Sequence, residues 1–185
     1  MLSSTDAVRV IAARLGDAAP PTGVQTKFVA IDGFGGAGKT TLAVSLSAKL
    51  GGVPIAHTDD FASWEQPLEW WPRMLAEVLV PLAAGRRARY RRHDWERRCL
   101  GDWCEIKPSE CVMVEGVSSS REAFRPYLAL AVWVEAPREE RLRRGLQRDG
   151  DVALAQWEQW MAREDEYAAR ERPQEHAQVV VSGVH

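Results

Sequence analysis

The chain has 185 residues, which suits one globular domain, and its 45% hydrophobic and 27% charged residues exclude disordered and collagen-like classes. A net charge of −2 argues against a general nucleic-acid-binding protein, and no apolar run approaches the roughly 18 residues that span a bilayer. The three cysteines form no paired or metal-binding pattern and no basic-then-apolar leader is present, so we expect a cytoplasmic protein without nucleic-acid or membrane partners.

The hydrophobic pattern predicts helices and short strands in alternation. Residues 3–16 have the spacing of an amphipathic helix, and a Pro- and Gly-containing break follows them. Short apolar runs predict strands at 28–31, 53–56, 111–114, 130–134 and 179–181. Helical segments are predicted between the strands, at about 70–84, 121–128, 138–148 and 152–170. The Arg-rich segment 86–104 has the least regular pattern and is expected to lie outside the sheet. The order predicts an α/β fold with a parallel five-stranded sheet sandwiched by helices, in one domain covering residues 1–185.

A glycine-rich motif follows the first predicted strand and opens a helical pattern. Residues 33–40 read Gly-Phe-Gly-Gly-Ala-Gly-Lys-Thr and fit the P-loop pattern GxxxxGK[ST], whose accidental occurrence in this chain has a probability of roughly 0.2%. Lys39 is expected to reach the β- and γ-phosphates and Thr40 to ligate Mg²⁺, so the motif implies ATP and Mg²⁺ as cofactors. The nucleotide-binding residues expected from it are Gly33, Gly35, Gly36, Ala37, Gly38, Lys39, Thr40 and Thr41.

Carboxylates follow two later strands. Asp59 and Asp60 come after the second predicted strand, at the sheet edge where open α/β proteins bind ligands. An aspartate there can take a proton from an attacking hydroxyl or hold a water on Mg²⁺, although helix capping would use the same residues. Glu115 ends the third strand in the manner of a Walker-B acidic residue and competes for the metal-side role. The candidate metal ligands are therefore Thr40, Asp59 and Glu115.

Arginines recur at helical spacing in residues 138–148. Four of them share roughly one face of the predicted helix: Arg138, Arg141, Arg144 and Arg148. They form either a movable lid that stabilises charge on the transferring phosphoryl group, or a solvated face that pairs with Glu139 and Glu140.

Tryptophans are frequent, with eight in the chain. Trp64 and Trp95 lie between the candidate base and the second acidic strand end, where a flat ligand could stack on them, and core packing accounts for them equally well. Core packing is the expected role of Trp70, Trp71 and Trp133. For Trp157 and Trp160, packing under the lid is favoured over contact with adenine.

Residues 27–183 resemble the uridine/cytidine kinase branch of the P-loop kinases. The run 31–43 is similar to that family's phosphate loop, and Asp59-Asp60-Phe61 is similar to its Asp-Ser-Phe/Tyr element, whose first Asp is the catalytic base. Residues 65–67 fall where the family has an Asp-His-Pro that contacts ribose hydroxyls. Residues 93–95 fall where it has a Tyr-Asp-Phe beside the base.

The resemblance implies an ATP-dependent small-molecule kinase with Asp59 as the favoured base. It divides the domain into an N-terminal helix and linker (1–22), an acceptor-side region (62–104), and a lid with its following helix (138–170). The catalytic residues that it implies are Asp59, Lys39, Arg144 and Arg148. The candidate substrate residues, from the resemblance and from the arguments above, are Asp60, Trp64, Glu65, His93, Asp94, Trp95 and Arg98.

Departures from the family pattern leave the acceptor open. Glu65, Gln66 and His93 replace the family's Asp, His and Tyr, and Arg98 stands about where a base-contacting His is expected. A nucleoside-like acceptor is favoured, and pantothenate, a sugar or an antibiotic are alternatives. A regulatory nucleotide-binding protein without an acceptor is a further alternative, although the Asn-Lys-x-Asp element of GTPases does not occur.

Overall fold

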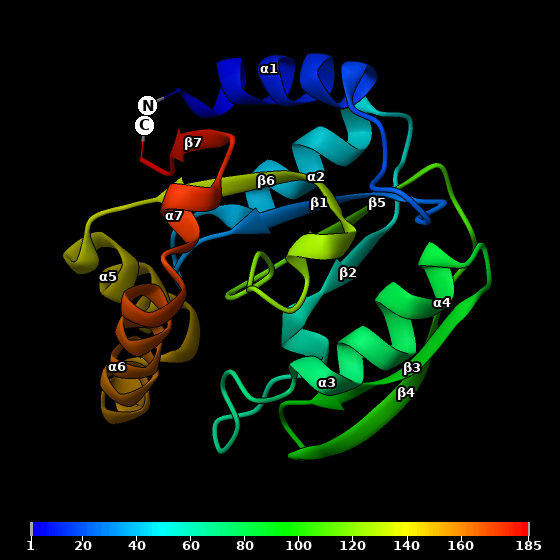
Figure 1. The fold of residues 1–185 in the computed structure, drawn as a ribbon. Helices are drawn as coiled ribbons and strands as arrows, with labels where there is room; N and C mark the ends of the chain where they lie inside the picture. The colour runs from blue at the N-terminus through cyan, green and yellow to red at the C-terminus, as the bar shows by residue number, and fades with distance from the viewer. Residues whose placement is uncertain (1, 185) are drawn as a thin grey trace.

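Five parallel strands form the centre of the molecule (Figure 1). The computed structural model describes residues 2–184, apart from the side chains of residues 4 and 5. In spatial order the strands are β2 (Ile55–His57), β5 (Cys111–Glu115), β1 (Lys27–Asp32), β6 (Leu128–Glu135) and β7 (Val179–Ser182). Every neighbouring pair is parallel, which confirms the predicted α/β fold and its five-stranded sheet.

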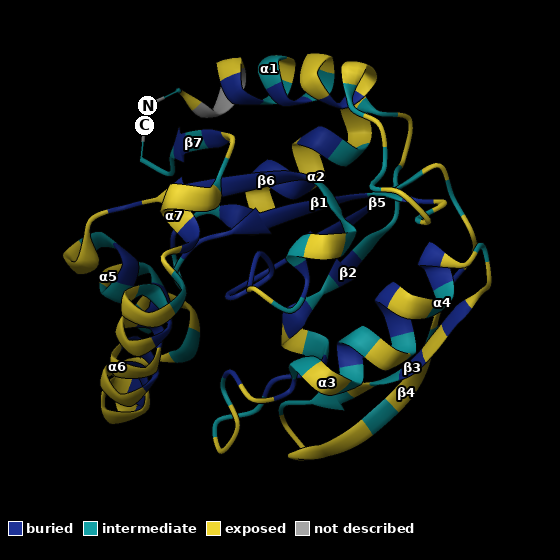
Figure 2. Ribbon diagram, in the orientation of Figure 1, coloured by how far each residue is buried: buried dark blue, intermediate teal, exposed yellow. Residues whose placement is uncertain are grey.

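The two faces of the sheet are covered by different elements (Figure 2). On one face, α1 (Ser4–Asp17) and α2 (Lys39–Lys49) pack against Ile31 of β1. On the other face, the helical segment 71–83 packs against Phe28 of the same strand. Both faces of the sheet are therefore covered, which explains why the strands appear in the sequence as short continuous apolar runs. None of the helices in residues 2–184 is long and apolar enough to cross a membrane.

Two helices follow β6 and lie beside the carboxyl ends of the strands (Figure 1). They are α5 (Arg138–Asp149) and α6 (Leu154–Glu171), and the short α7 (Pro173–His176) leads from them into β7. Together α5 and α6 occupy the predicted lid region, 138–170.

The segment 71–83 is one continuous helix with an irregular middle. It consists of α3 (Trp71–Met74), a π-helical turn (Leu75–Leu79) and α4 (Val80–Ala83), close to the predicted helix at 70–84. Pro81 has no backbone N–H to donate to a carbonyl in the preceding turn. The wider π-helical turn at Leu75–Leu79 accommodates this missing hydrogen bond.

The Arg-rich segment lies outside the five-stranded sheet, as expected, and forms a regular hairpin although its sequence pattern is the least regular in the chain. β3 (Ala88–Asp94) and β4 (Cys99–Ile106) pair antiparallel in a separate two-stranded sheet. Buried Ala88 and Tyr90 alternate with arginines, which is the two-residue period of a half-buried strand. The alternation does not continue along β3, since Arg91 is partly buried and Arg92 is exposed, and this hid the strand in the sequence.

The helix predicted at 121–128 does not form. Only a 3-10 turn, Arg125–Tyr127, is present in this fully described segment, and β6 begins at Leu128. The chain just before it is instead bound to a buried carboxylate, because Asp32 accepts hydrogen bonds from the backbone N–H groups of Ser118 and Ser120. The second strand is also shifted, since Pro54 has no N–H to add to the ladder.

Gly145→Ala should lower the free energy of unfolding by about 1–3 kcal/mol, because overpacking pushes two helices apart. A Cβ on Gly145 of α5 would lie 2.4 Å from the Trp157 ring of α6. Urea denaturation measures the loss. Gly16→Ala in α1 is the matched control, since nothing lies within 4 Å of its added Cβ, and an equal loss in both variants would contradict the explanation.

Candidate functional site

The loop between β1 and α2 has the features of a phosphate site. Gly36 and Gly38 adopt φ values of 74° and 98°, the left-handed region that favours glycine. Lys39 is buried and donates its Nζ to the carbonyl of Phe34 at 2.8 Å. Because α2 begins at Lys39, the positive end of its dipole also lies at the loop.

The predicted lid helices pack directly on this loop. Arg144 of α5 donates Nη1 to the carbonyls of Gly36 and Gly183, at 3.1 and 3.0 Å. Arg148 makes two bonds with Asp149, at 2.8 and 3.0 Å, at the end of the same helix. Arg144 therefore joins α5 to the phosphate loop, while Arg148 is held by a carboxylate beside it.

An acidic side chain at the end of β5 faces the start of α2. Glu115 accepts a bond from the Thr40 hydroxyl at 3.1 Å and lies 2.7 Å from Nδ1 of His57, its neighbour across the strand pair. Burial favours the neutral acid, but the bonds to His57 and Thr40 and the charge of Lys39 outweigh it, so the pKa of Glu115 is lowered. The Glu115 carboxylate raises the pKa of His57 in turn.

Asp59 lies in a 3-10 turn (Thr58–Asp60) directly after β2. Solvent reaches its side chain, yet protein atoms crowd the recess around it, and this desolvation raises the pKa of Asp59. The Lys39 and Arg148 charges oppose the rise, and Glu115 adds to it. The predicted base, the P-loop lysine and the β5 glutamate are thus near neighbours.

We expect the rate of a reaction that uses Asp59 as a base to fall as the pH is lowered through its raised pKa. Only the carboxylate accepts a proton, so the acid limb lies above the ordinary value of 3.8. Arg148→Gln removes a positive charge that lowers the pKa of Asp59 and should move the limb to higher pH. The measurement is kcat against pH, and a limb at the same pH in both proteins would contradict this assignment.

Asp60 faces the hairpin rather than the phosphate loop. Its Oδ2 accepts the Tyr90 hydroxyl at 2.8 Å. Burial and the Asp60 charge raise the pKa of Tyr90, which keeps its phenol a donor. The adjacent aspartates therefore have different partners in this structure.

Three tryptophans from separate segments meet beside Asp59. Trp64 lies 5.5 Å from Trp160 and 5.7 Å from Trp95 between ring centroids, both edge-on, and Trp95 lies 6.2 Å from Trp160. The Trp95 indole N–H donates to the Asp59 carbonyl at 3.1 Å. His93 packs edge-on against Trp95 at 5.1 Å. We call Trp64, Trp95 and Trp160 the tryptophan cluster.

The other predicted substrate residues lie at the hairpin tip. Asp94 accepts bonds from the backbone N–H groups of Glu96 and Arg97 and so stabilises the turn between β3 and β4. Arg98 donates to Glu65 at 2.6 Å, which joins the hairpin tip to the loop after Asp60.

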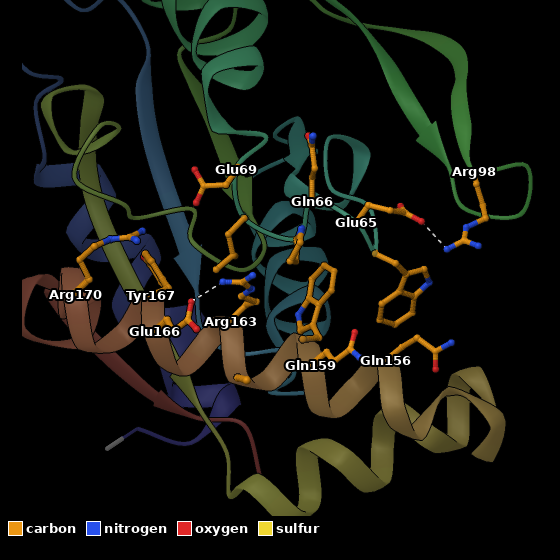
Figure 3. Close-up of a pocket in the computed structure, with 15 residues that line it drawn as sticks. Glu65, Gln66, Glu69, Arg98, Gln156, Gln159, Arg163, Glu166, Tyr167 and Arg170 are labelled. Atoms are coloured by element: carbon orange, nitrogen blue, oxygen red, sulfur yellow. Dashed lines mark hydrogen bonds and ion pairs between the residues drawn. The ribbon is translucent and has the colours of Figure 1, made fainter.

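A cavity of about 800 Å³ lies between that loop and α6 (Figure 3). It contains Trp64, Glu65 and Arg98 of the predicted substrate residues, but no residue of the phosphate loop. Its remaining lining is Gln66, Pro67, Leu68, Glu69, Gln156, Gln159, Trp160, Ala162, Arg163, Glu166, Tyr167 and Arg170. Trp64 and Trp160 belong to both the cavity wall and the tryptophan cluster, and Trp95 of the cluster donates to the Asp59 carbonyl, so the cluster links the cavity wall to Asp59.

The site has the oxygen ligands that Mg²⁺ prefers. Thr40 supplies a hydroxyl, and Glu115 and Asp59 supply carboxylates near the P-loop lysine. Within residues 2–184 no three His, Cys, Asp or Glu side chains are grouped to hold an ion. A magnesium ion here would complete its shell with nucleotide oxygens and water.

Sequence reasoning missed several residues of this region. His57 had no role assigned, and its position directly opposite Glu115 became evident only once β2 and β5 were paired. Glu164 continues the stripe of Trp157 and Trp160 on α6, and that spacing was the available signal for a buried carboxylate. Gln156 and Gln159, on the cavity side of α6, had no distinguishing pattern.

The sequence model of the AAA domain family matches residues 29–170, which is more than half of the chain. The matched region contains the phosphate loop, Asp59, Glu115 and α5. No curated protein sequence matches the chain.

Solved structures match the fold over nearly the whole chain. A possible uridine kinase from Bacillus stearothermophilus superposes with a TM-score of 0.72 at 22% identity, covering 96% of this chain and 98% of the other. A protein described as a candidate fructose transport system kinase from Silicibacter sp. TM1040 superposes with a TM-score of 0.62 at 20% identity, covering 98% and 99%. The resemblance predicted from the sequence is confirmed at the level of a P-loop kinase-like fold.

Proposed function

The chain belongs to the AAA domain family of P-loop proteins, and we propose that it transfers the γ-phosphoryl group of ATP to a hydroxyl of a small, nucleoside-like molecule. One observation supports this most directly. Asp59 is solvent-accessible and lies in the electrostatic field of both Lys39 and Glu115, so a hydroxyl bound there would meet a carboxylate beside the phosphate loop.

Each residue has a distinct task in this proposal. Asp59 accepts the proton of the acceptor hydroxyl as its oxygen attacks the γ-phosphorus, and the bond to the ADP oxygen breaks. Lys39 balances negative charge on the β- and γ-phosphates. Thr40, together with Glu115 or Asp59, would hold a magnesium ion, which would supply further positive charge against the phosphoryl oxygens. Arg148 is close enough to Asp59 to lower its pKa and becomes a phosphate ligand when its bond with Asp149 opens.

The cavity favours an uncharged acceptor. Each of its arginines already has a carboxylate partner, in the pairs Arg98–Glu65 at 2.6 Å, Arg163–Glu166 at 2.9 Å and Arg170–Glu171 at 3.4 Å. An anionic acceptor such as pantothenate would have to displace one of them. By contrast, three side-chain amides on the wall make no hydrogen bond within the described residues: Gln66, Gln156 and Gln159. Amides beside indole rings suit a ring that carries hydroxyl, amide or carbonyl groups.

The test is a screen for ADP release from Mg·ATP in the presence of acceptors sorted by charge. Uridine, cytidine and neutral sugars form the uncharged arm, pantothenate the anionic arm and an aminoglycoside the cationic arm. We expect ADP release that depends on an uncharged acceptor. Release with pantothenate or the aminoglycoside would assign another acceptor class, and ATP hydrolysis that no acceptor stimulates would favour a regulatory nucleotide-binding protein.

A further inference from the structure

Glu164 is a fully buried carboxylate that has no task in the proposed phosphoryl transfer. It lies on the inner side of α6, with 0% of its surface exposed. Its Oε1 accepts two hydrogen bonds, from the backbone N–H of Gly35 at 2.6 Å and from the indole Nε1 of Trp160 at 2.8 Å. Its Oε2 accepts a bond from Arg141 at 3.1 Å, so every partner is a donor. Burial raises the pKa of Glu164, and these donors oppose the rise.

The two donors on Oε1 belong to different parts of the site. Gly35 is in the phosphate loop, whereas Trp160 lines the acceptor cavity and contacts Trp64 and Trp95 of the tryptophan cluster. Trp95 in turn donates to the carbonyl of Asp59. A single oxygen atom therefore joins the loop that holds phosphate to the ring system beside the candidate base.

The approach of Glu164 to the loop is tight. A Cβ on Gly35 would lie 3.0 Å from Oε1 of Glu164 and 3.0 Å from the Trp157 ring, so the phosphate loop and α6 are closely packed at this point. Stability alone does not call for a buried ion pair here, because apolar residues of similar volume often replace such pairs at no loss. The Glu164 carboxylate instead contributes orientation, because its hydrogen bonds fix the directions of the Gly35 N–H and the Trp160 indole.

We propose that Glu164 is a positioning residue that holds the Trp160 wall of the acceptor cavity in register with the phosphate loop, so that a change at either one is transmitted to the other. The inference deepens the proposed function and rests on it. Because a coupling free energy between two sites is reciprocal, a defect at the cavity wall should weaken nucleotide binding although Trp160 makes no hydrogen bond to the loop itself.

The experiment is a double-mutant cycle on the affinity for Mg·ADP, measured by calorimetry with Glu164→Gln, Trp160→Phe and the double variant. Trp160→Phe keeps an aromatic ring in the wall and removes the indole donor together with part of the ring volume, and the control Trp103→Phe removes the same atoms at an exposed position. We expect Trp160→Phe to weaken Mg·ADP binding about 3- to 10-fold, Glu164→Gln to weaken it more, and the double variant to match Glu164→Gln alone. The matched controls are Glu158→Gln, an exposed change on the same helix, and Trp103→Phe, an exposed indole on β4, and both should bind like wild type.

Two results would overturn the inference. One is a wild-type affinity for Mg·ADP in Trp160→Phe. The other is a loss of affinity in the double variant that equals the sum of the two single losses. Either result would show that the Glu164–Gly35 and Glu164–Trp160 contacts act independently. Circular dichroism and melting confirm that each variant is folded, and if Glu164→Gln does not fold, Trp160→Phe alone decides. The proposed function fails separately, in the acceptor screen. Absence of Mg·ADP binding by the wild type would overturn both.

Discussion

Asp59→Asn is expected to reduce acceptor-dependent ADP release by about 10²- to 10⁴-fold, the usual contribution of a general base. The asparagine amide fills nearly the same volume but takes no proton at neutral pH. Nucleotide affinity should change little or improve, since the variant removes a negative charge near Lys39. The measurement is kcat from steady-state turnover, with Mg·ADP affinity determined on the same preparation.

Asp60→Asn is the informative comparison for this result. Asp60 accepts the Tyr90 hydroxyl, and an asparagine oxygen can still accept that bond, so turnover should stay within about tenfold of wild type. If Asp59→Asn retained activity and Asp60→Asn or Glu115→Gln lost it, the base would be one of those two residues instead.

Lys39→Ala is expected to lower kcat/KM for Mg·ATP by about 10²- to 10³-fold, the cost of removing one charge-stabilising donor from a phosphoryl-transfer site. The variant loses a buried ammonium that now bonds to the Phe34 carbonyl. Removing this positive charge should also raise the pKa of Asp59 further, so the acid limb of the rate should move to higher pH.

Lys49→Ala is the matched control for the lysine prediction. Lys49 is exposed in the last turn of the same helix, α2, and should tolerate the change with wild-type turnover. Equal losses in the two variants would show that the effect comes from the helix as a whole. Unchanged kcat/KM in Lys39→Ala would remove the phosphate loop from the proposed reaction.

Patterns carried by consecutive residues were sufficient for most of the fold. The five strands were predicted because each is an apolar run of a few residues. The helix at 3–16 was predicted because apolar residues recur at helical spacing, and in the predicted helix at 138–148 arginines have that spacing. The hairpin and the missing helix at 121–128 were not predictable in this way. Arginines in β3 obscured the alternation of the hairpin strand. The chain before the missing helix is hydrogen-bonded to Asp32, a residue distant in the sequence.

In the candidate site too, local sequence patterns predicted some features and only the folded structure revealed the others. The sequence by itself determined the phosphate loop and the carboxylates after β2 and β5, because these chemical groups lie within short runs beside a strand end. Only the tertiary structure decided which groups meet. Gly35 and Glu164 are 129 positions apart in the sequence, and the Gly35 backbone nitrogen lies 2.6 Å from Oε1 of Glu164. The partners of Asp60 and Arg98 are 30 and 33 positions away. Burial and pairing arise only when strands and helices pack, so the electrostatics of the site belongs to the folded molecule.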